Sequence, residues 1–152
     1  MSLLSSIRHI IIDVDGVLRR NRQPLPGAAE FPRWLESRGI GYMIVSNNAS
    51  STPAQLQAAL AEIGIVIDLH RFLTSAAGAA RLLQRELPQG GKVYLIGGEG
   101  LRQAILGDGL FVEDDKRPDC VVVAADRTFN YEKLRIACRA IRQGARFVAT
   151  NR

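Results

Sequence analysis

Two aspartates separated by one residue carry the clearest chemical signal in this sequence. Residues 13–16 read Asp-Val-Asp-Gly and directly follow the apolar run 10–12. Two carboxylates at this spacing can point into one site, where a hard cation such as Mg²⁺ offsets their mutual repulsion. Gly16 permits a tight turn whose N–H groups suit a phosphate. Asp13, Asp15 and Gly16 therefore predict a metal-assisted phosphate site, with a plain Asp-Gly turn as the alternative.

A second polar cluster, Ser46, Asn47 and Asn48, follows another apolar run at 42–45. Its hydroxyl and N–H groups form a neutral donor set for phosphoryl oxygens, whose charge is spread over several atoms during transfer. Taken alone, the cluster also fits a loop that leads into a helix. If the two preceding strands are neighbours, both clusters face one crevice beyond the carboxyl ends of the strands. Their coincidence favours phosphate chemistry.

The elements that position these clusters alternate between apolar runs of strand length and helical patterns, which predicts an α/β fold with a mainly parallel sheet. Strands are expected at 9–13, 41–45, 72–74, 92–96, 119–125 and 146–150. Helices are expected at 26–37, 53–63, 75–87, 101–106 and 130–143. A boundary near residues 74–91 is expected to separate two α/β parts.

Composition narrows the classes of protein. The 152 residues, 47% of them apolar, are typical of a globular domain. The net charge of +5 attracts anions of any kind, but the basic patch at 19–22 lacks interleaved aromatic residues, so a solvated loop is favoured over a nucleic-acid site. No apolar run reaches the roughly 18–20 residues of a membrane span, so a cytoplasmic protein without a membrane partner is expected. Cys120 and Cys138 have apolar neighbours and are expected to be buried free thiols.

The motifs together resemble the haloacid dehalogenase-like (HAD) hydrolases. The resemblance rests, in order, on residues 10–18, 26–28, 45–48 and 144–151. It is closest to the NagD-like branch, which includes p-nitrophenyl, phosphoglycolate and pyridoxal phosphatases, and it extends over essentially the whole chain. It implies that residues 1–77 are the N-terminal part of a Rossmann-like core and that residues 78–152 are an incomplete α/β cap domain.

The resemblance also implies a role for each matched residue. Asp13 would attack phosphorus and become an aspartyl phosphate, while Asp15 would protonate the leaving alcohol and later activate water. Mg²⁺ would be held by the Asp13 carboxylate and the Asp15 backbone carbonyl. Ser46 would bind the phosphoryl group, assisted by the backbone around Gly16 and Asn47.

Further positions are implied to face the substrate. Asn48, Thr150 and Asn151 match substrate-side or cap segments of the family. The substrate would be a small phosphorylated metabolite, which the cap would recognise as it closes over the site. A homo-oligomer is compatible with these features.

Two parts of the family pattern are missing: a lysine after the cap, and an acidic motif that completes the metal site. Lys92, Lys116 and Lys133 all lie before that place. Electrostatic groups of this sort are worth about 10²–10³ in rate each, so we expect a truncated phosphatase that is inactive alone. The alternative is a non-catalytic protein that binds a phosphorylated ligand or a partner chain. A phospho-accepting receiver domain fits the Asp-x-Asp-Gly order poorly.

Overall fold

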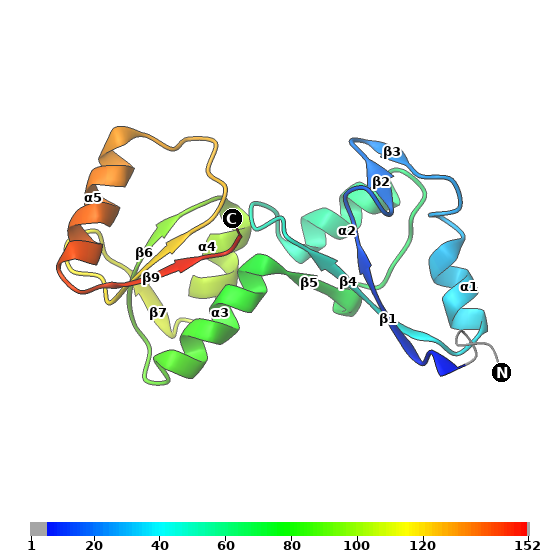
Figure 1. The fold of residues 1–152 in the computed structure, drawn as a ribbon, viewed down its shortest axis with the longest axis horizontal. Coiled ribbons are helices and arrows are strands. Elements are labelled where there is room, and N and C mark those ends of the chain that lie inside the picture. Colours follow the sequence, from blue (N-terminus) through cyan, green and yellow to red (C-terminus); the bar gives the residue numbers. More distant parts are fainter. Residues whose placement is uncertain (1–5, 152) are drawn as a thin grey trace. The chain divides into compact units, whose positions relative to one another are not determined.

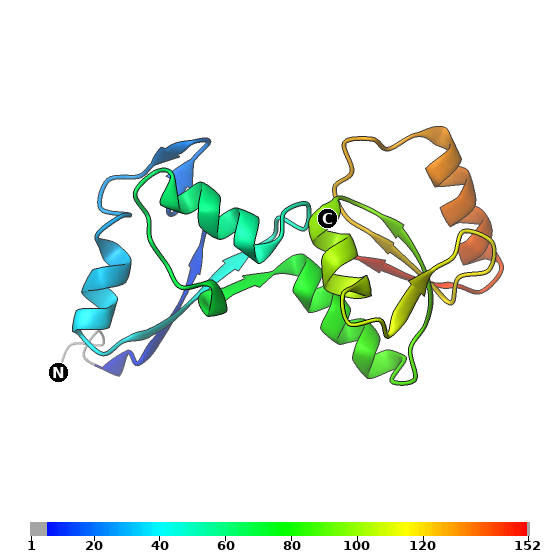
Figure 2. The same ribbon diagram turned by 180° about the vertical axis from the view of Figure 1, so that it is seen from behind.

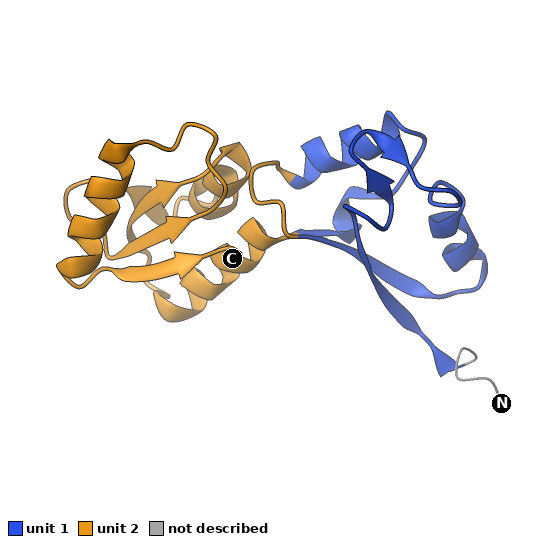
Figure 3. Ribbon diagram, turned by 45° about the horizontal axis from the view of Figure 1, so that its top comes forward, with its two compact units in different colours: residues 1–46, 53–73 blue, residues 47–52, 74–152 orange. Residues whose placement is uncertain are grey.

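The structure is a computed structural model that describes residues 6–151 and divides into two compact units (Figures 1 and 2). The first unit contains the described residues up to Ser46 together with Pro53–Leu73. The second contains Asn47–Thr52 together with the described residues from Thr74 onward (Figure 3). The short segment 47–52 therefore belongs to the second unit although both of its sequence neighbours belong to the first.

The first unit holds the strands that precede both polar clusters. Its elements are β1 (His9–Asp13), β2 (Arg19–Arg20), β3 (Gln23–Pro24), α1 (Phe31–Ser37), β4 (Gly41–Ser46), α2 (Pro53–Ala61), the 3₁₀ helix η2 (Leu69–Arg71) and β5 (Phe72–Thr74). The last residue of β5, Thr74, is counted with the second unit.

The second unit continues the alternation of helices and strands. Its elements are α3 (Ser75–Glu86), β6 (Gly91–Ile96), α4 (Glu99–Leu106), β7 (Phe111–Glu113), β8 (Cys120–Val123), α5 (Tyr131–Arg142) and β9 (Arg146–Ala149). Across residues 6–151, none of the helices combines the length and the hydropathy that crossing a membrane requires.

The sheet of the first unit has the strand order β1-β4-β5. β1 and β4 run parallel in a register that places Asp13 opposite Val45 and Ile12 opposite Ile44. Helices α1 and α2 pack on the face that carries Ile12 and Ile44, which are 3% and 0% exposed. On the opposite face Ile11 is 76% exposed. This sheet is thus covered by helices on one face and open to solvent at Ile11 on the other.

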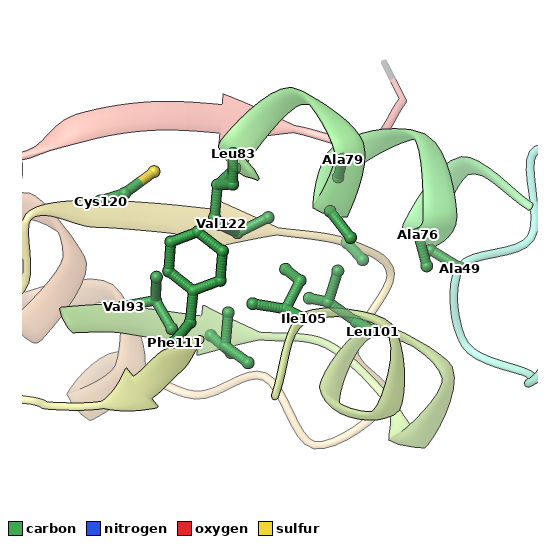
Figure 4. Packing of buried hydrophobic residues seen from close by; sticks show 13 residues of the cluster. Ala49, Ala76, Ala79, Leu83, Val93, Leu101, Ile105, Phe111, Cys120 and Val122 are labelled. Atoms are coloured by element: carbon green, nitrogen blue, oxygen red, sulfur yellow. The ribbon is translucent and has the colours of Figure 1, made fainter. Parts of the chain in front are cut away.

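The sheet of the second unit has the order β7-β6-β8-β9, and its paired strands are all parallel. Successive residues of a strand point to opposite faces, and here helices cover both. Helices α3 and α4 pack on the face that carries Val93 and Val122 (Figure 4). Helix α5 packs on the face that carries Tyr94 and Val121. The predicted α/β class with mainly parallel strands is confirmed.

Two predicted segments differ from the structure near the first site. The first helix begins at Phe31 rather than at Pro26, because Gly27 has a left-handed φ of 81° that a right-handed helix cannot contain. The basic patch expected to be a solvated loop is a hairpin, in which β2 pairs with β3 around Asn21 at φ 58°.

One prediction for the second unit was also wrong. Helix α3 begins at Ser75 as expected, and its N-cap is Thr74, which has an extended backbone and a hydroxyl that accepts a hydrogen bond from the Ala77 N–H at 3.3 Å. Cys120 is buried as expected, whereas Cys138 is exposed. Helix α5 turns Ala137 toward the sheet, and the next residue along a helix points about 100° away.

Candidate active site

The two predicted clusters begin at the carboxyl ends of neighbouring strands. Asp13 is the last residue of β1, and Ser46 is the last residue of β4. Because the strands are parallel and Asp13 lies opposite Val45, their ends lie side by side at the usual strand spacing of about 5 Å. The two strands are thus neighbours, which is the condition that the sequence analysis set, and Asp13 and Ser46 lie at the same edge of one sheet.

Asp13 presents an exposed carboxylate on a fixed backbone. Its Oδ1 accepts a hydrogen bond from the N–H of Val14 at 2.8 Å. Val14 is fully buried, at 0% exposed, so the chain is anchored directly after the aspartate while Asp13 itself remains exposed. A carboxylate held in this way is suited to attack along a defined direction.

A compact turn follows the first strand and returns the chain to the core. The N–H groups of Leu18 and Arg19 both donate to the Val14 carbonyl, at 2.9 and 3.1 Å. Gly16 has a φ of 92°, which a residue with a side chain rarely adopts, and donates its N–H to the Arg19 carbonyl at 2.7 Å. In this structure Gly16 therefore contributes the shape of the turn, and its own N–H is used inside it.

Asp15 has an ionic partner that the sequence analysis did not find. The guanidinium of Arg19 donates to the Asp15 carboxylate with an Nε–Oδ1 distance of 3.0 Å. The side chain of Arg19 is 16% exposed and that of Asp15 is 52% exposed. An ion pair this open to water adds little stability, but it fixes where the Asp15 carboxylate lies. The sequence signal for this pair is an arginine four residues after the aspartate. From the sequence, that arginine is expected to lie in a basic loop.

The second cluster is divided between the two units. Ser46 is 2% exposed at the end of β4 in the first unit. Asn47 and Asn48 belong to the second unit. The Asn48 side chain accepts a hydrogen bond from the N–H of Ser50 at 2.8 Å, which curls the segment after β4, while Asn47 is exposed.

The remaining predicted residues lie at the carboxyl edge of the second sheet. The Thr150 N–H donates to the Val123 carbonyl at 2.9 Å, and its hydroxyl contacts the Asn151 side-chain oxygen at 3.1 Å. The first unit therefore contains Asp13, Asp15, Gly16 and Ser46, whereas the second contains Asn47, Asn48, Thr150 and Asn151.

The donor types around Asp13 suit magnesium, but they are few. The Asp13 carboxylate and the Asp15 carbonyl are hard oxygen ligands, which Mg²⁺ takes together with several waters and substrate phosphate oxygens. Over residues 6–151, no three Asp, Glu, His or Cys side chains gather in a cluster that could hold a metal ion. These two protein oxygens are thus of the chemical type that binds Mg²⁺.

Two lysines neutralise acids within the second unit. Lys92 lies 2.9 Å from Asp114, and Lys133 lies 2.6 Å from Asp126. Burial raises the pKa of Asp126, but hydrogen bonds from Lys133 and Thr128 outweigh that effect and hold its pKa below the usual range. Both lysines therefore serve local ion pairs.

Comparison with known proteins points to one family. Residues 10–110 match the family described as haloacid dehalogenase-like hydrolase. The chain is 35% identical over 148 residues to an acid sugar phosphatase of Staphylococcus saprophyticus, covering 97% of this chain and 57% of that protein. It is 39% identical over 149 residues to the 5'-nucleotidase YutF of Bacillus subtilis, with the same two coverages of 97% and 57%.

Solved structures agree with the sequence relatives. NagD from E. coli K-12 superposes with a TM-score of 0.88 at 34% identity, covering 95% of this chain and 57% of that one. A glycerol phosphate phosphatase from Mycobacterium tuberculosis, in complex with calcium, superposes with a TM-score of 0.87 at 33% identity, covering 99% and 45%. The chain spans little more than half the length of the relatives it matches.

Proposed function

The chain belongs to the haloacid dehalogenase-like hydrolases, and on this premise we propose that it forms the nucleophile-bearing part of a Mg²⁺-dependent phosphomonoester hydrolase of the cytoplasm. The proposal is carried by the placement of Asp13 and Ser46 at adjacent carboxyl ends of parallel strands, the edge at which open α/β sheets bind ligands. Small phosphorylated metabolites are the proposed substrates, since two relatives are named acid sugar phosphatase and 5'-nucleotidase.

In the first step Asp13 acts as the nucleophile. A carboxylate oxygen forms a bond to phosphorus while the bond between phosphorus and the alcohol oxygen breaks, and Asp15 gives its proton to that oxygen. The Val14 N–H donates a hydrogen bond to Asp13 Oδ1 and so holds the Asp13 carboxylate in place during the attack. When bound, Mg²⁺ supplies positive charge that offsets the charge of the phosphoryl oxygens.

In the second step Asp15 acts as a base. It takes a proton from water, the water oxygen bonds to phosphorus, and the bond between phosphorus and Asp13 breaks, which releases inorganic phosphate and restores both aspartates. Arg19 lies 3.0 Å from the Asp15 carboxylate and positions it beside the turn. Gly16 shapes that turn, and Ser46 and Asn47 are proposed to bind phosphoryl oxygens.

The two compact units are proposed to have different roles. The first is assigned to the catalytic core, and the second to a cap that recognises the leaving group. Asn48, Thr150 and Asn151 are assigned to this recognition. Thr150 and Asn151 follow β9 at the carboxyl edge of the second sheet, where parallel sheets place their ligand-binding loops.

We propose that the 152 residues act as one part of a longer enzyme. Efficient hydrolysis needs more metal ligands than the two oxygens near Asp13, and residues 6–151 hold no cluster of three. It also needs a cation at the phosphate, whereas Lys92 and Lys133 pair with Asp114 and Asp126. The chain alone is therefore expected to hydrolyse phosphate esters slowly.

Hydrolysis of 4-nitrophenyl phosphate with Mg²⁺, by a full-length protein that contains this chain, tests the proposal. We expect Asp13→Asn to lower kcat by about 10³-fold or more, because the nucleophile is lost. Asp68→Asn is the matched control, since Asp68 is an exposed aspartate of the same unit without a role in the site. Equal activity of Asp13→Asn and wild type would remove Asp13 as the nucleophile.

A non-catalytic phosphate-binding protein is the second candidate, favoured by the two-ligand metal site. It predicts that the chain binds inorganic phosphate without turning over any ester, even as part of a longer protein. The two candidates separate in the same assay, because only the enzyme releases 4-nitrophenol.

A further inference from the structure

We propose that Gly98 and Gly100, at the start of α4, are positioning residues for the loop 47–52 that follows Ser46. Through them, the second unit holds the backbone next to the phosphate-binding serine. The role given to Asn47 in phosphate binding rests on the proposed function. The docking of the loop rests on contacts within the second unit alone.

The loop is built into the core of the second unit. Ala49 is 2% exposed and belongs to the apolar cluster that contains Ala76 of α3 and Leu101 of α4; Figure 4 shows Ala49 beside Ala76. Thr52, at the end of the loop, is 6% exposed. A surface loop that buries an apolar side chain in this way is held by packing at its centre.

Three hydrogen bonds fix the loop to the surrounding structure. The Gly100 N–H donates to the Ser50 carbonyl at 3.0 Å, which joins the loop to the first turn of α4. The Ser50 hydroxyl donates to the Ala125 carbonyl at 3.2 Å, in the segment after β8. The Ser75 hydroxyl donates to the Asn47 carbonyl at 2.8 Å, at the start of α3. The loop is therefore tied at its beginning and at its middle.

The loop packs so closely against the start of α4 that Gly98, the N-cap, and Gly100, in the first turn, must both be glycine. A Cβ on Gly100 would lie 2.3 Å from the carbonyl oxygen of Ser51 and 2.8 Å from that of Ala49. A Cβ on Gly98 would lie 2.9 Å from the carbonyl oxygen of Ser50. These atoms are backbone, so they cannot turn aside as the end of a side chain can. Gly98 has an ordinary φ of −80°, so contact with the loop, not conformation, explains the glycine.

The consequence concerns the residues beside Ser46. Asn47 is exposed at its side chain, but its carbonyl is held by Ser75. The Asn48 side-chain oxygen accepts a hydrogen bond from the N–H of Ser50. The Ser50 carbonyl in turn accepts one from the Gly100 N–H. The Asn47 carbonyl and the residues that follow it are thus held by contacts within the second unit, the part that is proposed to recognise the leaving group.

Three glycine-to-alanine variants of the 152-residue chain test the inference. Gly78→Ala in α3 is the control, since its Cβ would meet no atom within 4 Å. Gly98→Ala is the moderate change and Gly100→Ala the severe one. Amide hydrogen exchange at residues 48–52 and the affinity for inorganic phosphate with Mg²⁺, followed by NMR at Asn47, are measured for each.

We expect amide exchange in the loop to accelerate on the order of tenfold in Gly100→Ala and by less in Gly98→Ala. Phosphate affinity should fall by about fivefold in Gly100→Ala and by less in Gly98→Ala. Gly78→Ala should match wild type in both. Ser75→Ala, which removes one hydrogen bond and adds no clash, should weaken phosphate binding about twofold and serves if a glycine variant does not fold.

Each other result overturns a different statement. Unchanged exchange in Gly98→Ala and Gly100→Ala would show that the loop is not held at α4. Faster exchange with unchanged phosphate affinity would show that docking does not position the phosphate residues. Absence of phosphate binding by wild type would overturn the proposed phosphate site, and with it the positioning role, while the exchange data would still report on the docking.

Discussion

Both units contain a sheet with helices packed on it, but the helices cover more of the sheet in the second unit. In the first, helices α1 and α2 cover one face of the sheet, and Ile11 on the other face is 76% exposed. In the second, helices cover both faces, and Val121 and Val122 of β8 are both fully buried at 0%. Parallel sheets are usually covered on both sides. The candidate catalytic aspartates thus lie in the unit whose packing is less complete.

The difference shows that the position of a site and the completeness of the packing around it are separate properties. Asp13 needs only the parallel pairing of β1 with β4 and the turn anchored by buried Val14 and Leu18 to be held at the sheet edge. The second unit, which has two apolar clusters, carries no paired aspartates of that kind. Its fuller packing instead holds the loop 47–52.

The largest expected effect comes from truncating each core separately. Leu60 of α2 and Leu83 of α3 are 0% and 1% exposed, in different units. Leu60→Ala and Leu83→Ala are each expected to cost about 2–5 kcal/mol of unfolding free energy. Hydrogen exchange should show the loss in the mutated unit alone. Equal loss in both units would contradict the comparison, since it would mean that they unfold as one.

A smaller effect is expected from the Asp126 ion pair of the second unit. The Asp126 side chain is 6% exposed and accepts hydrogen bonds from Lys133 and Thr128. Lys133→Met leaves the carboxylate with fewer donors, and the second unit should lose about 1–3 kcal/mol at neutral pH. Lys116→Met, at an exposed lysine, is the control.

The same pair predicts a dependence on pH. Because the pKa of Asp126 is lower in the folded state, its contribution is present above the unfolded value of about 3.9 and is lost as pH falls through the folded pKa. Acid denaturation followed at residues of the second unit should therefore show a smaller pH dependence in Lys133→Met than in wild type. An unchanged acid midpoint in the variant would disprove this account.

The smallest effect tests the open face of the first sheet. Ile11→Thr is expected to change stability by no more than about 0.5 kcal/mol, because the side chain is largely in water. Ile12→Thr, on the covered face at 3% exposed, should cost several times more. Thermal or chemical denaturation of the two neighbouring variants gives a direct comparison. A large cost at Ile11 would show that this face is covered in solution.

The sequence predicted the long elements well because their apolar patterns are strong. The runs that became β1, β4, β6 and β8 are largely continuous in apolar residues, which is typical of parallel strands. The burial on both faces that such a run predicts holds for β6 and β8 but not for β1, where Ile11 is exposed. The hairpin β2-β3 and strand β7 were missed, because strands of two or three residues rarely show a detectable period, although β5, also three residues long, was predicted.

The sequence could predict the positions of site residues only where those residues end a strand. The end of a strand can be located in a sequence, so Asp13 and Ser46 could be placed at one edge. The Asp15–Arg19 pair depends on the exact turn at Gly16, and the docking of Ser50 against Gly100 joins residues 50 apart in the chain. An arginine four residues after an aspartate does not by itself specify the first contact, and the second follows from tertiary packing, which leaves no local pattern.

The position of the loop 47–52 also limits how the second unit can be exchanged between proteins. Its structure is not one continuous stretch of sequence, because six residues from between β4 and α2 complete it. A gene fragment that encodes only residues 74–152 would leave Gly98 and Gly100 facing empty space and remove Ala49 from the apolar cluster. Swapping this unit therefore requires that residues 47–52 be transplanted with it.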